Sequence, residues 1–170
     1  MKLKEVGFTV RKIVEYISMG CLGYAFVCGL AMMFHIVTDV TCRYLSIPIY
    51  GTYEIVCNWY MVAFFFMGLA YIELTRSHIS VTMFTSRISK RWSIVYEIFG
   101  SVVMFVVFLI FGWYGLLSAI DDYKIGAFRE GVIRIITWPT AFYIPIGCWA
   151  TCAQQLVNIH DDFLKLMRKN

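Results

Sequence analysis

Residues 16–38 read YISMGCLGYAFVCGLAMMFHIVT, without a single Asp, Glu, Lys or Arg. A helix that crosses a bilayer needs about 20 mostly apolar residues. Backbone groups in lipid must be hydrogen-bonded within their own segment, and nothing here alternates polar and apolar residues as barrel strands do. Further uncharged stretches cover residues 55–72, 98–120 and 135–160. We therefore expect an all-α membrane protein of four transmembrane helices, at residues 13–38, 54–74, 94–120 and 135–158.

The composition agrees with one integral membrane domain over residues 1–170. Of the 170 residues, 60% are hydrophobic and 15% are charged, whereas soluble domains carry about 25% charged residues. The net charge of +4 does not indicate nucleic-acid binding, because the basic residues form no continuous stripe. The six cysteines lack paired spacing, which favours apolar packing over a disulfide framework or a metal site.

The basic residues predict the orientation. Eleven of the fifteen Lys and Arg residues lie in the N-terminal flank, between the second and third helices, or in the C-terminal tail. Basic loops stay in the cytoplasm, so we expect both termini there and residues 39–54 and 121–134 on the opposite side. Residues 1–12 and 75–92 also carry apolar residues at helical spacing, which predicts a short amphipathic helix at the interface for each. A plain basic segment is the alternative.

The interior of the predicted helices offers little chemistry. Asn58, Gln154 and Gln155 are the main polar groups, and we expect them to hydrogen-bond between helices, with a transport path as the alternative. Pro145 lies inside the fourth predicted helix and should kink it. Haem ligation, drug export and hydrolysis each need ionisable or nucleophilic groups in places where this chain has none. We expect no catalytic, cofactor-binding or metal-binding residues and no enzyme activity.

The segment between the first two helices carries three ionisable side chains. Asp39 and Arg43 are four residues apart on one helix face, with the acid first. Pro48 and Gly51 favour a turn, after which Glu54 enters the second helix at the depth of Arg43. The spacing predicts an ionic cluster of Asp39, Arg43 and Glu54 that joins the two helices. Alternatively, each charge caps its own helix at the headgroup level.

The order of these residues resembles a known family. The run Arg43-Tyr44, Pro48, Gly51 and Glu54 continues with Phe66-Met67-Gly68 and with His78-Ile79. It is similar to the small membrane subunit of tripartite ATP-independent periplasmic (TRAP) transporters, the DctQ-like family. The site residues we expect to be structural or to form an interface are Asp39, Arg43, Tyr44, Pro48, Gly51, Glu54, Gly68 and His78.

The resemblance implies a multi-pass subunit of the bacterial inner membrane with two protein partners. A large membrane subunit would hold the sodium and substrate sites, and a periplasmic substrate-binding protein would deliver an organic acid, such as sialic acid or another carboxylated sugar. This chain would brace the scaffold of the large subunit and hold no cofactor. The outer segments at residues 45–53 and 121–134 would lie near the binding protein. The alternative is a self-sufficient small homo-oligomeric transporter or channel.

Overall fold

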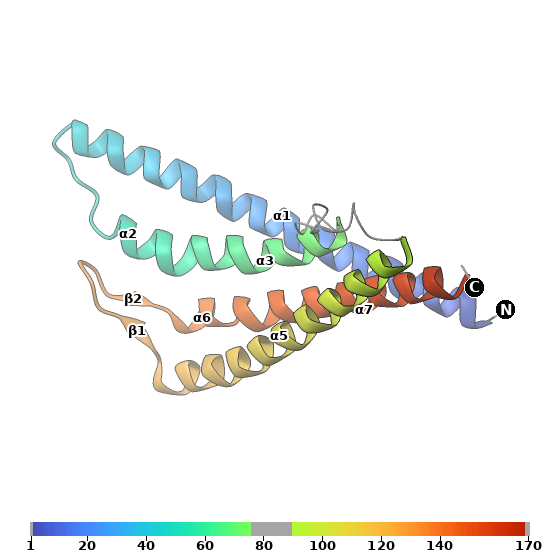
Figure 1. Cartoon of the computed structure of the whole chain (residues 1–170). Coiled ribbons are helices and arrows are strands. Elements are labelled where there is room, and N and C mark those ends of the chain that lie inside the picture. The colour runs from blue at the N-terminus through green and yellow to red at the C-terminus, as the bar shows by residue number, and fades with distance from the viewer. Residues whose placement is uncertain (1, 76–89, 169–170) are drawn as a thin grey trace.

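The computed structural model describes residues 2–75 and 90–168, and these form four long helical segments (Figure 1). The first is α1 (Lys2–Tyr44). The second is continuous through α2 (Thr52–Ile55), the π-helix η1 (Val56–Tyr60) and α3 (Met61–Leu74). The third is α5 (Lys90–Ile125), and the fourth joins the short α6 (Trp138–Ala141) to α7 (Tyr143–Arg168).

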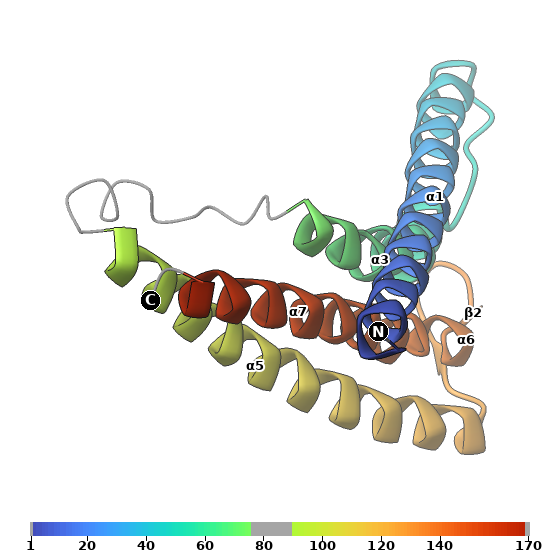
Figure 2. The same ribbon diagram turned by 90° about the vertical axis from the view of Figure 1, so that its right-hand side faces the viewer.

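α3 and α7 form the centre of the bundle. α3 packs against α1 and α7, α7 packs in turn against α5, and α1 also contacts α7. Figure 2 shows that α5 runs alongside α7, whereas α1 is steeply inclined to both. Both termini lie at one end of the molecule, and the linker at residues 45–51 lies at the other end (Figure 1). The long helices therefore run alternately in opposite directions.

Three helical segments in the described part of the chain are long and apolar enough to cross a membrane: Arg11–Tyr44, Thr52–Leu74 and Val95–Ile125. The fourth, α7, has sufficient length at 26 residues but carries more polar side chains. Thr151, Gln154, Gln155 and Asn158 on α7 are buried inside the bundle. A helix that packs between other helices can carry such residues because they face protein rather than lipid.

Both α1 and α5 end at the same kind of cap. Ser46 has a left-handed backbone with φ 62°, and the Ile47 N–H donates to the Cys42 carbonyl at 2.9 Å. Gly126 has φ 61°, and the Ala127 N–H donates to the Asp122 carbonyl at 2.8 Å. In this arrangement an N–H beyond the helix end satisfies a carbonyl of the last turn. The caps stop α1 at Tyr44 and α5 at Ile125, beyond the ends that we expected at residues 38 and 120.

The N-terminal segment is not a separate interfacial helix. α1 is continuous from Lys2, since no proline precedes residue 48 and proline is the strongest helix breaker. The interfacial helix expected at residues 75–92 falls mostly on residues 76–89, which lie outside the described residues.

Pro145 lies one turn after a break in the fourth helical segment, which is where a proline is expected to disturb a helix. The fourth segment is interrupted after α6, and α7 begins at Tyr143, so Pro145 occupies its first turn. The missing N–H of proline costs little there, because first-turn N–H groups have no partner within the helix.

A small hairpin precedes α6, where we expected an outer segment at residues 121–134 and the start of the fourth helix at residue 135, so the predicted start of that helix was wrong. β1 (Phe128–Arg129) pairs antiparallel with β2 (Ile135–Ile136), with Phe128 opposite Ile136. The Arg134 guanidinium lies 3.3 Å from the centroid of the Phe128 ring, a cation–π contact that closes the hairpin. The hairpin lies at the same end of the molecule as the linker at residues 45–51 (Figure 1).

Candidate functional site

The ion pair expected on α1 is present. Arg43 Nε donates to Asp39 Oδ2 at 2.9 Å. The Arg43 side chain is 61% exposed, whereas that of Asp39 is 9% exposed. Such a pair within one helix contributes about 0.2–0.5 kcal/mol in water. Asp39 Oδ1 is buried without a hydrogen bond to any described residue. The pair orders the end of α1 but does not satisfy the whole carboxylate.

The expected bridge from Arg43 to Glu54 does not form. The buried Glu54 instead accepts a hydrogen bond from the Val132 N–H, 2.7 Å from Oε1. The sequence could not show this, because Val132 lies 78 positions further along the chain. The predicted ion pair between Asp39 and Arg43 is therefore confirmed, whereas the predicted participation of Glu54 in the same cluster was wrong. Glu54 joins the second helical segment to the hairpin rather than to α1.

Other contacts hold the hairpin against the same segment. Trp59 Nε1 donates to the Ile136 carbonyl at 3.1 Å. Gly51 is buried at φ 87°, and a side chain there would collide with Ile133. A Cβ on Gly131 would meet the Glu54 carboxylate. We call Glu54, Trp59 and the hairpin residues 131–136 the hairpin clamp.

The remaining predicted site residues are less engaged. Tyr44 ends α1 and is 88% exposed, and Pro48 lies exposed in the linker. Gly68 lies on α3 with open space where a Cβ would stand. His78 falls outside the described residues. Of the eight predicted residues, Asp39, Arg43, Gly51 and Glu54 therefore make the specific contacts.

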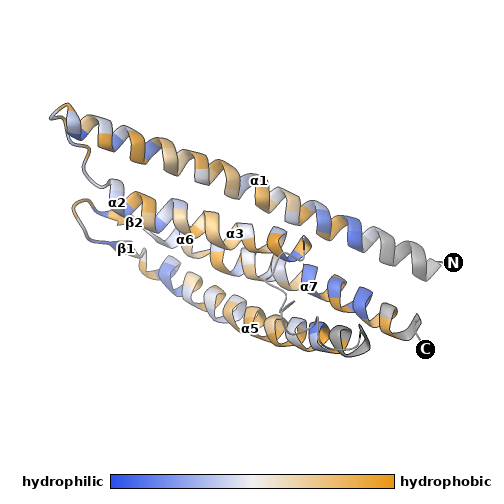
Figure 3. Cartoon of the chain, turned by 45° about the horizontal axis from the view of Figure 1, so that its top comes forward, coloured by the Kyte–Doolittle hydropathy of each residue, from blue (hydrophilic) through white to orange (hydrophobic). Residues whose placement is uncertain are grey.

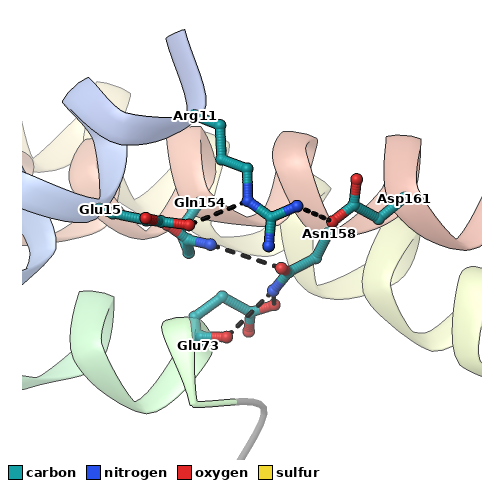
Figure 4. A network of polar contacts seen from close by, with 6 residues as sticks. All are labelled: Arg11, Glu15, Glu73, Gln154, Asn158 and Asp161. Carbon is teal, nitrogen blue, oxygen red and sulfur yellow. Dashed lines mark hydrogen bonds and ion pairs between the residues drawn. The ribbon is translucent and has the colours of Figure 1, made fainter. Parts of the chain in front are cut away.

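A second polar cluster lies toward the termini and was not expected as a unit (Figure 4). Asn158 Nδ2 donates to both the side chain and the backbone carbonyl of Glu73, at 2.8 and 3.0 Å. Asn158 and Glu73 are both buried. Gln154 Nε2 lies 3.4 Å from Asn158 Oδ1 and extends the network along α7. These bonds tie α7 to the last turn of α3.

Arg11 connects α1 to the same region (Figure 4). Its Nε donates to Glu15 at 2.9 Å within α1, and its Nη1 donates to Asp161 of α7 at 3.1 Å. The Arg11 side chain is 51% exposed, so each pair contributes at most about 1 kcal/mol. We call Arg11, Glu15, Glu73, Gln154, Asn158 and Asp161 the termini-end network.

We expected Asn58, Gln154 and Gln155 to hydrogen-bond between helices, and the contacts of the described residues do not show this. Asn58 Nδ2 donates to the Glu54 carbonyl of its own helix at 2.7 Å. The π-helix Val56–Tyr60 shifts the backbone pairing at this point, and π-bulges leave carbonyls that side chains can satisfy. Gln154 bonds within α7, and Gln155 is buried with Oε1 unpartnered among the described residues. Asn158 therefore has the interhelical role that we expected for these residues.

The charged side chains of the described helices lie toward the two ends of the molecule, and apolar surface covers much of the helices between them. Hydrophilic colours mark the helix ends in Figure 3, and hydrophobic colours dominate their middles. Phe26, Phe34, Phe99 and Phe111 are each at least 60% exposed. Such extended apolar surface requires lipid or a protein partner.

The family comparison agrees with this arrangement. The model of the family described as "Tripartite ATP-independent periplasmic transporters, DctQ component" matches residues 32–165, which is most of the chain. The chain belongs to the DctQ family. No curated protein and no solved structure matches it.

Family membership confirms the resemblance seen in the sequence. The matched range begins in α1 before Asp39 and ends in α7 after Asp161, so it includes both the hairpin clamp and most of the termini-end network. This DctQ protein is a component of a tripartite transporter and a multi-pass protein of the inner membrane. DctQ proteins form a family of transporter components.

Proposed function

We propose that this DctQ chain is the small, non-catalytic membrane subunit that braces the scaffold of a larger transport subunit. One observation carries the proposal: the charged residues of the described helices lie toward their ends, and the spans between them are apolar. A transport path for an organic acid normally has ionisable groups near mid-membrane. The uncharged middle of this chain supports a path housed in a partner.

The exposed apolar surface supports the same proposal. A bracing subunit must offer one apolar face to the large subunit and the rest to lipid, and the exposed faces of α1 and α5 are available for both. The hairpin clamp and the termini-end network fix the helices to one another at opposite ends. A subunit tied at both ends can hold its shape while a partner moves against it.

Affinity purification of the tagged chain tests this function. The chain should be co-expressed with the membrane proteins encoded beside it and isolated in mild detergent. We expect one large membrane partner at equal stoichiometry. Isolation of homo-oligomers alone would favour the rival function, a self-sufficient transporter or channel built around Asn58, Gln154 and Gln155.

We further propose four spans with both termini in the cytoplasm. The eleven-to-four distribution of basic residues and the placement of both termini at one end support this orientation. Terminal epitope tags should resist protease added to intact spheroplasts, whereas a tag inserted after Glu130 should be cleaved. The reverse pattern would contradict the orientation.

The proposed cargo is an organic acid imported with sodium, and a carboxylated sugar such as sialic acid is the first class to test. The family supports only a TRAP-type system, and the sodium and substrate sites would lie in the large subunit. We also propose that the hairpin end of the chain faces the periplasmic binding protein. Reversing the charge of both Asp121 and Asp122 should then raise the half-saturating concentration of the loaded binding protein in uptake. Unchanged kinetics would contradict that contact.

A further inference from the structure

A pocket of about 270 Å³ lies between the end of α1 and the start of the second helical segment. The linker forms one wall, Val132 of the hairpin region contributes to another, and Arg43, Thr52 and Glu54 provide polar groups. The pocket opens where the candidate spans Arg11–Tyr44 and Thr52–Leu74 end and begin. In a bilayer it therefore lies at headgroup depth, whichever side of the membrane it faces.

Two polar groups of the pocket are left without partners inside the protein. Thr52 is 6% exposed, and its hydroxyl has no hydrogen bond to any described residue. Arg43 uses Nε for Asp39, and its two terminal nitrogens have no hydrogen bond among the residues that the structure describes. A buried hydroxyl without a partner is costly. A guanidinium with two free donors is suited to bind a phosphate.

The charges around the pocket select the ligand. Asp39 and Glu54 carry two formal negative charges and Arg43 carries one positive charge, so the site has a net charge of −1. The net negative charge would repel a free anion. It would not repel a zwitterion, because a zwitterion has no net charge. Glu54 is a lining residue of the pocket, and a carboxylate can accept hydrogen bonds from a primary ammonium. The linker side chains Ile49 and Tyr50 offer apolar contact, and Tyr50 is exposed, as is typical of tyrosine at a membrane interface.

We propose that this pocket binds the headgroup of a phosphatidylethanolamine molecule from the surrounding bilayer. Arg43 and Thr52 donate hydrogen bonds to the phosphate, and Glu54 accepts from the ethanolamine ammonium. The acyl chains continue along the apolar end of α1. The bound lipid fills the gap between α1 and the second segment, where the expected Arg43–Glu54 bridge does not form. This binding does not depend on the transport function proposed above.

Lipid retention tests the proposal directly. The full-length chain is exchanged into mixed micelles that contain equal amounts of phosphatidylethanolamine, phosphatidylcholine and phosphatidylglycerol. Free lipid is then removed, and the lipids that remain bound are quantified by mass spectrometry. The variants are Arg43→Gln and Thr52→Val. Arg129→Gln is the matched control, because it removes a cation at the same end of the molecule but outside the pocket.

We expect phosphatidylethanolamine to be enriched over the other two lipids on the wild-type chain. Arg43→Gln should lower its retention about tenfold, as for loss of a charge-assisted hydrogen bond. Thr52→Val should lower retention less, and Arg129→Gln should not change it. If Arg43→Gln fails to fold, as judged by circular dichroism, Thr52→Val decides the outcome.

Three results would overturn the proposal. One is equal retention of the three lipids by the wild-type chain. Another is wild-type retention in every folded pocket variant. The third is equal thermal stabilisation by inorganic phosphate alone, which would show an anion site without lipid selectivity.

Discussion

At the scale of single residues, burial decides which polar contacts matter. Arg11 makes two ion pairs, but its side chain is half exposed, and water screens both pairs. Asn158 is buried and bonds to a buried carboxylate. Loss of the Asn158 amide would leave Glu73 with fewer donors in a place that water does not reach easily. The buried amide is therefore the more important residue for joining the helices.

Replacement of Asn158 by Ala should destabilise the chain by about 1–3 kcal/mol, because it removes two hydrogen bonds to Glu73. Thermal unfolding in detergent measures the loss. Asn58→Ala is the control, since the hydrogen bond that Asn58 makes among the described residues is to a carbonyl of its own helix. A larger loss for Asn58→Ala than for Asn158→Ala would contradict the assigned roles.

Glu54→Ala should loosen the hairpin, because it removes the acceptor of the Val132 N–H. Loss of a hydrogen bond to a charged group costs about 1.5–3 kcal/mol, which corresponds to amide exchange at least about tenfold faster. Hydrogen–deuterium exchange of residues 128–136 reports the effect. Glu130→Ala, an exposed glutamate in the same hairpin, should leave exchange unchanged. Equal exchange in the two variants would count against the clamp.

At the scale of elements, close backbone approach determines how α7 meets α3. A Cβ on Gly147 would collide with the backbone carbonyl of Phe66. Since Gly147 allows this approach, α3 and α7 can pack as the central pair of the bundle. Small residues have this role at many helix contacts within membranes. Gly100 on α5 is the opposite case, with open space around the position of a Cβ.

Gly147→Ala should therefore destabilise the chain by about 1–3 kcal/mol through overpacking. Gly100→Ala should be neutral or slightly stabilising, because alanine favours a helix more than glycine does. Thermal unfolding of both variants under the same conditions compares them. Equal stability would show that α3 and α7 are not packed this closely.

Element positions could be predicted better than contacts. Runs without charge predict where the long helices lie, because lipid imposes a length and a composition on each span. The ends were harder to predict: Ser46 acts as a left-handed cap on α1, and serine is an uncommon residue for that role. The hairpin clamp could not be predicted, because Glu54 and Trp59 find their partners about 80 positions away. Gln154 and Gln155 are polar residues in an apolar run, so the sequence predicted that they would bond between helices. Asn158 makes that bond instead.

At the scale of the whole molecule, the helix segments that lack charged residues are also those that expose apolar side chains. The apolar middle of the helices faces outward over much of α1 and α5, and polar contacts close the two ends. α7 is the most polar of the long helices and lies between α3 and α5. This arrangement supports the proposed role of a membrane subunit whose apolar faces contact lipid and a larger partner.

Sodium-driven uptake into proteoliposomes tests the central claim, that this DctQ chain acts only as part of a larger transporter. Vesicles would contain this chain alone, the large membrane subunit alone, or both, each with the periplasmic binding protein and its bound organic acid outside. We predict uptake only when both membrane proteins are present, and none with this chain alone. Sodium-dependent uptake by this chain without the large subunit would contradict the account.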